Sequence, residues 1–227
     1  MIAALLAMQI AGSAALSVTP MQAVPHVTWA PEQPGQGQLF ILRVAPADGQ
    51  SVSAVRGRAA GETLHFERVG NGGFESLAAV PIAAEDSITP SITVVYANGR
   101  EEELSPSVPV SIGEYRHARL TVAPALGRPL DSAQQARLAR DRTRAAGVSR
   151  LAHRTPRIWT EELVVPRDAR VTSGFGDGRV FNGQVSSRHM GLDLAGETGD
   201  TVMAVSRGGV ALVDQFLLAG NIVSLNH

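Results

Sequence analysis

The sequence predicts a mainly β protein in which two β modules are joined by an Arg-rich, partly helical connector. Three features support this: short apolar runs between turn residues in the first half, one helical segment in the middle, and glycine-punctuated β segments near the C-terminus. Charge divides the chain at similar places, with 5 Arg and 10 acidic residues in 1–113, 10 and 3 in 114–158, and 5 and 8 in 159–227. We therefore expect modules at 25–113 and 160–227, with the connector at 114–158.

The N-terminal segment indicates export. Met1–Leu16 carries no charge, and its 16 residues are fewer than the about 20 that a membrane span needs. Small residues follow, so we interpret 1–23 as a signal-peptide-like segment cleaved after Ala23, with a buried helix as the alternative. The basic start of a signal peptide is missing, which suggests a true start upstream. We expect an exported protein of the periplasm or cell envelope with no stable transmembrane span.

The first module is expected to be an immunoglobulin-like β-sandwich, because several short strands follow one another over about 85 residues. Turns are expected at Gly70–Gly73 and at Asn98-Gly99, whose residues tolerate positive φ. No cluster of catalytic residue types accompanies them, and His26, His65 and His117 are interpreted as surface or structural residues. The expected strands are Gln38–Val44, Leu64–Arg68, Phe74–Ile82 and Ser91–Tyr96.

The connector should contain a helix that is capped by Asp131 or Ser132, runs to about Ala146 and ends at Gly147. Its arginines form no single stripe, which favours a solvated helix that spaces the two modules. Contact with an anionic cell-envelope polymer is the alternative. The arginines concerned are Arg137, Arg140, Arg142 and Arg144.

Composition excludes several kinds of chemistry. All twenty basic residues are Arg, so the chain has no lysine for a phosphate loop, a Schiff base or a lipoyl or biotin attachment. It also lacks Cys, which excludes thiol nucleophiles and cysteine-ligated metals. A metal site must therefore use His, Asp or Glu. The net charge of −1 gives no overall attraction to nucleic acid or anionic lipid.

His189 and Asp193 are the metal candidates. On a strand these two residues would share a face, with Gly191 between them adding no side chain. Met190, Leu192 and Leu194 would then face a buried side. Zinc accepts both imidazole nitrogen and carboxylate oxygen, and a catalytic zinc uses three protein ligands with one open position for water. The pair supplies two of these three ligands.

This C-terminal segment resembles the lysostaphin/LytM-type zinc endopeptidases, which cut peptide cross-links in bacterial cell walls. The resemblance covers about 60 residues in the order and spacing that the family shows. Residues 25–165 also look like the accessory region of exported Gram-negative members, a match based on architecture. The motifs that carry the resemblance are Thr172–Gly176, Phe181–Gly183, His189–Asp193, Gly199–Ala204 and Gly220–Val223.

The resemblance implies a Zn²⁺ cofactor held partly by His189 and Asp193, and peptidoglycan peptides as partners. It places Asn182 beside the metal cleft, where it would orient substrate or a ligand. The third ligand and the catalytic histidines are expected beyond residue 227, so none is present here. We therefore expect the domain at 160–227 to be incomplete and C-terminally truncated, and the chain alone to be inactive. His227 matches a non-ligand histidine of the family.

The resemblance has further implications and leaves alternatives open. Contact between the accessory and peptidase domains is possible, and His153 in the connector is a poor substitute ligand. A non-catalytic member of the fold that activates cell-wall amidases is one alternative, although it has no need of a coordinating pair. A lipoyl- or biotinyl-type carrier would need the missing Lys. A cell-wall-binding protein would depend on few aromatic residues, namely Trp29, Tyr96 and Trp159.

Overall fold

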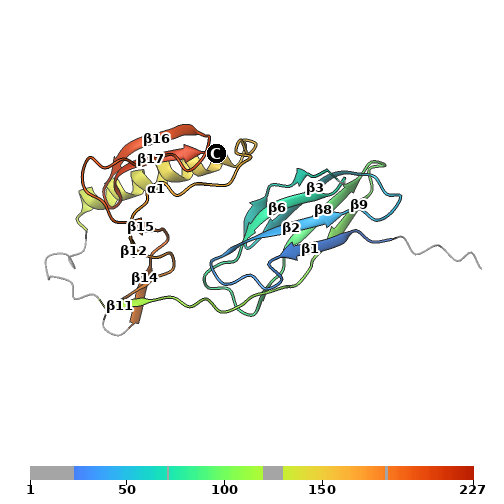
Figure 1. Cartoon of the computed structure of the whole chain (residues 1–227), viewed down its shortest axis with the longest axis horizontal. Coiled ribbons are helices and arrows are strands. Elements are labelled where there is room, and N and C mark those ends of the chain that lie inside the picture. The colour runs from blue at the N-terminus through green and yellow to red at the C-terminus, as the bar shows by residue number, and fades with distance from the viewer. Residues whose placement is uncertain (1–22, 71, 120–129, 182–183) are drawn as a thin grey trace, which may run out of the picture.

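The computed structural model describes residues 23–70, 72–119, 130–181 and 184–227. The described chain is mainly β with one helix, as the sequence predicts (Figure 1). The signal-like segment 1–22 lies outside the described residues. No helix in the described part of the chain is long and apolar enough to cross a membrane.

The first module consists of two four-stranded antiparallel sheets (Figure 1). One sheet has the order β1-β2-β6-β5, and the other has the order β4-β3-β8-β9. The first contains β1 (His26–Ala30), β2 (Leu39–Ala45), β6 (Phe74–Ala79) and β5 (Glu67–Arg68). The second contains β4 (Glu62–Leu64), β3 (Val52–Ala59), β8 (Ser91–Tyr96) and β9 (Glu101–Leu104), and β7 (Ser87–Ile88) pairs separately with β10 (Val108–Pro109).

The core of this module lies between the two sheets because their strands alternate in hydrophobicity. Phe40, Leu42 and Val44 of β2 are buried, as are Ile92 and Val94 of β8. Residues at alternate positions of a strand face the same side, so both strands turn their apolar sides to one core. The predicted sandwich is therefore confirmed.

Two predicted strands differ from the structure by more than one residue at an end. The segment predicted at Leu64–Arg68 splits into β4 and β5, because the chain passes there from one sheet to the other. The strand predicted at Phe74–Ile82 ends at Ala79, just before Val80 and Pro81. Proline has no N–H to continue the ladder. The Asn98-Gly99 turn forms as predicted, with Gly99 at φ 83° and its N–H donating to the Tyr96 carbonyl.

The helix α1 runs from Ser132 to Ala152. Asp131 is its N-cap: its carboxylate accepts the Gln134 N–H at 2.8 Å, and the Gln134 side chain accepts the Asp131 N–H at 3.0 Å. The predicted end at Gly147 is wrong. Glycine inside a helix costs only about 1 kcal/mol, and the following residues continue the turns until the His153 N–H closes the last one on Ser149.

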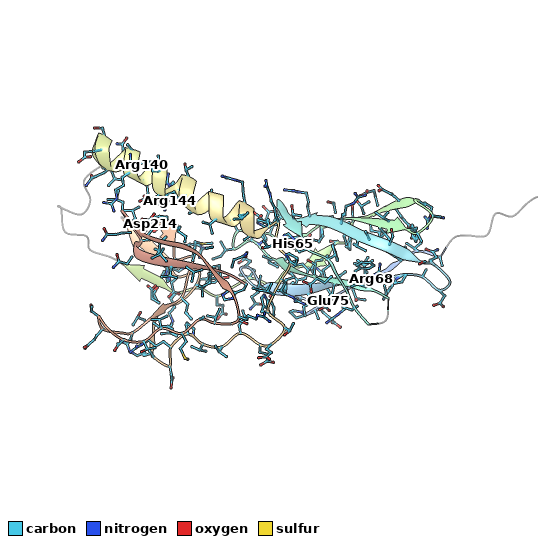
Figure 2. The ribbon with its side chains drawn as sticks, turned by 90° about the horizontal axis from the view of Figure 1, so that it is seen from above. His65, Arg68, Glu75, Arg140, Arg144 and Asp214 are labelled. Atoms are coloured by element: carbon cyan, nitrogen blue, oxygen red, sulfur yellow. The ribbon has the colours of Figure 1, made fainter. Side chains whose placement is uncertain are left out.

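The helix lies against the hairpin of β16 (Gly209–Phe216) and β17 (Gly220–Asn226). Asp141 is buried in this contact and accepts the Leu217 N–H at 2.8 Å. Arg137 donates to the Gln215 carbonyl at 3.0 Å, and Arg144 forms an ion pair with Asp214 (Figure 2). The helix is thus docked on the hairpin along one side, and two of its arginines have structural partners there.

The remaining strands form two small sheets that position the candidate site. β13 (Gly178–Phe181) lies between β14 (Gln184–Arg188) and β11 (His117–Arg119). β12 (Val171–Ser173) pairs with β15 (Asp193–Leu194). Because β11 lies in the connector before the helix and β13 lies in the C-terminal module, this sheet joins the start of the connector to the segment that carries the candidate metal residues.

Candidate metal centre

The side chains of His189 and Asp193 meet, with Nε2 of the imidazole 3.1 Å from Oδ1 of the carboxylate. The predicted continuous strand across them is wrong: β14 ends at Arg188, β15 begins at Asp193, and the chain bends at Gly191 between them. The bend, rather than strand alternation, brings the two side chains together.

The bend also explains a second error. Met190 and Leu192, predicted to face a buried side, are 67% and 57% exposed. A strand presents alternate residues to one face of a sheet, whereas these residues lie in an irregular segment between two strands.

The other nitrogen of the His189 ring is held by the turn before it. Nδ1 lies 3.1 Å from the Gly174 carbonyl oxygen and 3.1 Å from the Ser173 hydroxyl. A carbonyl oxygen only accepts hydrogen bonds, so this contact assigns a ring proton to Nδ1 and leaves Nε2 directed toward Asp193. Two electron-rich atoms at that distance are stabilised by a cation or a proton between them. Metal-binding histidines are oriented in this same way, through a hydrogen bond from the second ring nitrogen.

Backbone hydrogen bonds fix His189 on the turn that spans residues 174–177. The Gly176 N–H donates to the His189 carbonyl at 2.7 Å, and the His189 N–H donates to the Asp177 carbonyl at 2.8 Å. The Asp177 carboxylate accepts the Gly174 N–H at 2.8 Å and closes the turn. Gly176 has φ 81°, a conformation that favours glycine. The motif at Thr172–Gly176 therefore supports His189.

Asp193 is held from the other side, by the pairing of β12 and β15. Ser173 pairs with Asp193, and the Thr172 hydroxyl donates to the Asp193 carbonyl at 3.2 Å. The Asp193 side chain remains 53% exposed, so the carboxylate is open to solvent. A Cβ on Gly191 would lie 3.5 Å from Nε2 of His189. Glycine at 191 thus leaves space beside the donor atom.

Comparison with known proteins gives one informative kind of match. No family model matches the chain, and no curated protein matches its sequence. Among solved structures, the chain matches a Pseudomonas aeruginosa protein assigned to peptidase family M23, to which the LytM-type enzymes belong. The match covers 86% of this chain and 69% of the other, with a TM-score of 0.54 and 19% identity.

The chain has an M23-peptidase fold. At 19% identity the comparison establishes the fold alone, and it confirms the resemblance at that level. The mainly β fold class is confirmed by the strands of the chain itself.

The residue types at the centre of this M23-type fold suit zinc, because imidazole nitrogen and carboxylate oxygen are both zinc ligands. Among the described residues, no group of three or more His, Asp or Glu side chains could hold a metal. The prediction that His189 and Asp193 supply two zinc-ligand positions stays a prediction. Asn182, the predicted substrate-binding residue, lies outside the described residues.

Three other histidines, His65, His153 and His227, have partners elsewhere in the described chain. His227 Nδ1 is 2.9 Å from the Arg207 carbonyl, in agreement with a structural role. His65 stacks on His153, with Nε2 of the first 3.0 Å from Nδ1 of the second. These two residues line a cavity of about 490 Å³, together with Trp159 and His227. The stacked pair could not be read from the sequence, because the two residues are 88 positions apart.

The aromatic residues considered for wall binding have structural partners. Tyr96 is only 4% exposed and is part of the sandwich core, so it is not available to stack on a sugar. Trp29 packs against the same core and donates its indole N–H to the Glu32 carbonyl at 2.9 Å. The Arg157 guanidinium lies over Trp159, with its central carbon 4.7 Å from the centre of the tryptophan ring. The structure thus gives little support to an aromatic binding platform.

Proposed function

We propose that this protein is a zinc metalloendopeptidase that cleaves peptide cross-links of bacterial peptidoglycan. One observation carries the proposal: within an M23-type fold, Nε2 of His189 faces Oδ1 of Asp193 at 3.1 Å while Nδ1 is held by the Gly174 carbonyl. A metal-binding histidine is oriented in this way, with one ring nitrogen held by a hydrogen bond and the other directed at the metal position.

The chain's own residues have separable roles in this proposal. His189 and Asp193 bind the metal, and the Gly174 carbonyl fixes the tautomer and orientation of the imidazole. The exposed side of Asp193 leaves the centre open to an extended peptide. A bound zinc ion supplies Lewis-acid polarisation of the scissile carbonyl and an activated water. The signal-like segment supports a substrate in the cell envelope.

Digestion of purified sacculi by the full-length gene product tests the proposal. We expect peptide cross-links to be cleaved after chelator treatment and zinc addition, with the products identified by mass spectrometry. Asp193→Asn should lower the rate by more than about 100-fold, beyond the effect typical of residues that only support a ligand. Asp168→Asn is the matched control, because Asp168 is an exposed carboxylate in the same region.

Two results would contradict the proposal. Cleavage that persists in Asp193→Asn would remove this carboxylate from the reaction. Stimulation of a wall amidase by a product that has no zinc-dependent cleavage of its own would instead identify a regulatory member of the fold.

A further inference from the structure

Tyr115 lies where the β-sandwich meets the turn that holds His189. Its ring is surrounded by glycines from three parts of the chain. A Cβ on Gly176 would lie 2.2 Å from two ring carbons, and one on Gly113 would lie 2.6 Å from the ring. On Gly37 the Cβ would lie 2.5 Å from the phenol oxygen. A Cβ essentially never makes nonbonded contacts this short, so the ring occupies space that only glycines leave open.

The phenol end of Tyr115 is anchored on the sandwich. Its hydroxyl donates to the Gln36 carbonyl. Gln36 is itself fixed: its side-chain amide donates to the Ala84 carbonyl at 2.6 Å and accepts the Gly113 N–H at 3.1 Å. Its backbone N–H donates to Ser111 at 2.9 Å. The sandwich therefore holds this end of the ring at a defined position.

The other side of the ring contacts the metal centre's supporting turn. Gly176 lies against the ring and donates its N–H to the His189 carbonyl. Its own carbonyl accepts a 3.0 Å hydrogen bond from Arg188, whose guanidinium lies 5.3 Å from the ring centre of Tyr115. A backbone hydrogen bond links the same two segments: the Gly178 N–H, just after the turn, donates to the carbonyl of Arg116, the residue after Tyr115, at 2.8 Å. Tyr115 and Arg188 thus hold Gly176 from two sides.

We propose that Tyr115 is a positioning residue that couples the sandwich to the metal centre, by holding the 174–177 turn where the Gly174 carbonyl orients the His189 imidazole. The role as metal support rests on the proposed function. The orientation of the ring does not, because it can be measured in the metal-free chain. A residue that only adds stability would weaken the whole protein without changing the His189 ring.

NMR of the metal-free 227-residue chain tests the coupling. The readouts are the His189 ring resonances and the hydrogen exchange of the Gly176 and His189 amides. Tyr115→Ala should speed exchange at both amides by at least about tenfold, which corresponds to about 1.4 kcal/mol of local opening. It should also shift the His189 ring signals toward those of a free imidazole.

The chain contains a matched control, since Tyr96 is its other tyrosine. Tyr96→Phe removes a 2.7 Å hydrogen bond to Glu102 inside the sandwich and should leave both readouts unchanged. Tyr115→Phe keeps the ring in its socket and loses only the bond to Gln36. It should therefore restore the His189 ring signals, with exchange faster by no more than about fivefold.

A zinc titration of the same variants tests the role in metal binding. Tyr115→Ala should weaken zinc binding at His189 by about 10–100-fold, the range typical of groups that orient a ligand, and Tyr115→Phe should retain most of it. If the unchanged chain binds no zinc at His189, the proposed function fails while the exchange experiment still decides the coupling.

Unchanged exchange and ring signals in Tyr115→Ala would overturn the inference. If that variant does not fold, Tyr115→Phe decides: faster exchange at Gly176 and His189, and not across the sandwich, supports the coupling. Exchange equal to that of the unchanged chain, or raised uniformly, contradicts it.

Discussion

The sandwich and the C-terminal region are stabilised in different ways. Every buried hydrophobic side chain that the structure describes lies between Phe40 and Val110, in the sandwich. From residue 160 onward, by contrast, many large apolar side chains are exposed, for example Val213 at 68% and Val223 at 64%. The region that carries the candidate metal pair thus has no buried apolar core among its described residues.

The C-terminal region is organised instead by hydrogen bonds, ion pairs and contacts with its neighbours. The Arg167 guanidinium forms an ion pair with Asp200 at 2.6 Å and donates to the Ala195 carbonyl at 3.0 Å. Asp141 of the helix caps the hairpin through Leu217, and Tyr115 supports the turn beside His189. The difference teaches that apolar burial stabilises the sandwich, whereas directional bonds position the candidate metal pair.

The largest expected effect comes from the sandwich core. Leu42→Ala should lower the free energy of unfolding by about 2–5 kcal/mol, because Leu42 is fully buried and its truncation leaves a cavity. Leu218→Ala is the matched change in the C-terminal region, where the leucine is 68% exposed, and it should stay within about 0.5 kcal/mol. Urea denaturation followed by circular dichroism measures both. Equal effects would break the comparison.

The next largest effect is a change in zinc binding at His189 and Asp193 that leaves the stability of the sandwich core unchanged. Gly191→Ala places a methyl group 3.5 Å from Nε2 of His189, an ordinary contact distance that the fold tolerates. It occupies space beside the donor atom, so zinc binding should weaken by about tenfold while the unfolding transition stays unchanged. Calorimetric titration with zinc measures the binding, and denaturation of the same sample measures the stability. A lower stability with unchanged zinc binding would show that Gly191 serves the fold.

A smaller effect is expected at the helix between the two regions. Asp131→Ala removes the capping hydrogen bond to Gln134 and should destabilise the first turn of α1 by about 1 kcal/mol. Asp131→Asn should keep most of the cap. Amide exchange in residues 132–136 is the readout, and equal protection in both variants would show that the hairpin contact alone holds the helix.

The smallest effect is a pH dependence confined to the sandwich. Burial, followed by the hydrogen bond to the Glu102 carboxylate, raises the pKa of the Tyr96 hydroxyl above its usual 10. The folded state therefore keeps this proton to a higher pH than the unfolded chain does. The stabilisation is complete below pH about 10 and is lost as the pH rises through the folded-state pKa. Tyr96→Phe should flatten the fall in thermal stability above pH 10, and a fall of unchanged steepness would exclude Tyr96 as its cause.

The sequence predicts those parts of the fold that depend on local patterns. The alternation of Phe40, Leu42 and Val44 is visible in one short segment, as is the capping residue Asp131. Strand β3 was missed because Arg56, Gly57 and Arg58 interrupt its apolar pattern. Gly57 is needed there, since a Cβ would lie 2.7 Å from the Ser91 carbonyl oxygen on the neighbouring strand. A contact between distant segments of this kind has no local signal.

In the candidate site, too, the sequence predicts some features and misses others. The motifs around His189 and Asp193 identify the pair, but their alternation on a strand is not what unites them, because the chain bends at Gly191. The carbonyl of Gly174 and the ring of Tyr115 also support the site through contacts that form only in the folded chain. Residue types could thus be predicted, whereas the groups that orient them could not.

The central claim is that His189 and Asp193 form a metal-binding pair, which the turn at residues 174–177 orients. An NMR-monitored zinc titration of the 227-residue chain tests it most directly. His153→Ala serves as the matched control, because His153 lies in the cavity at the end of the helix. The account predicts that zinc shifts the His189 ring signals in the unchanged chain and in His153→Ala, and that His189→Ala abolishes this binding with the sandwich still folded. Zinc binding that survives His189→Ala, or is lost in His153→Ala, would contradict the account.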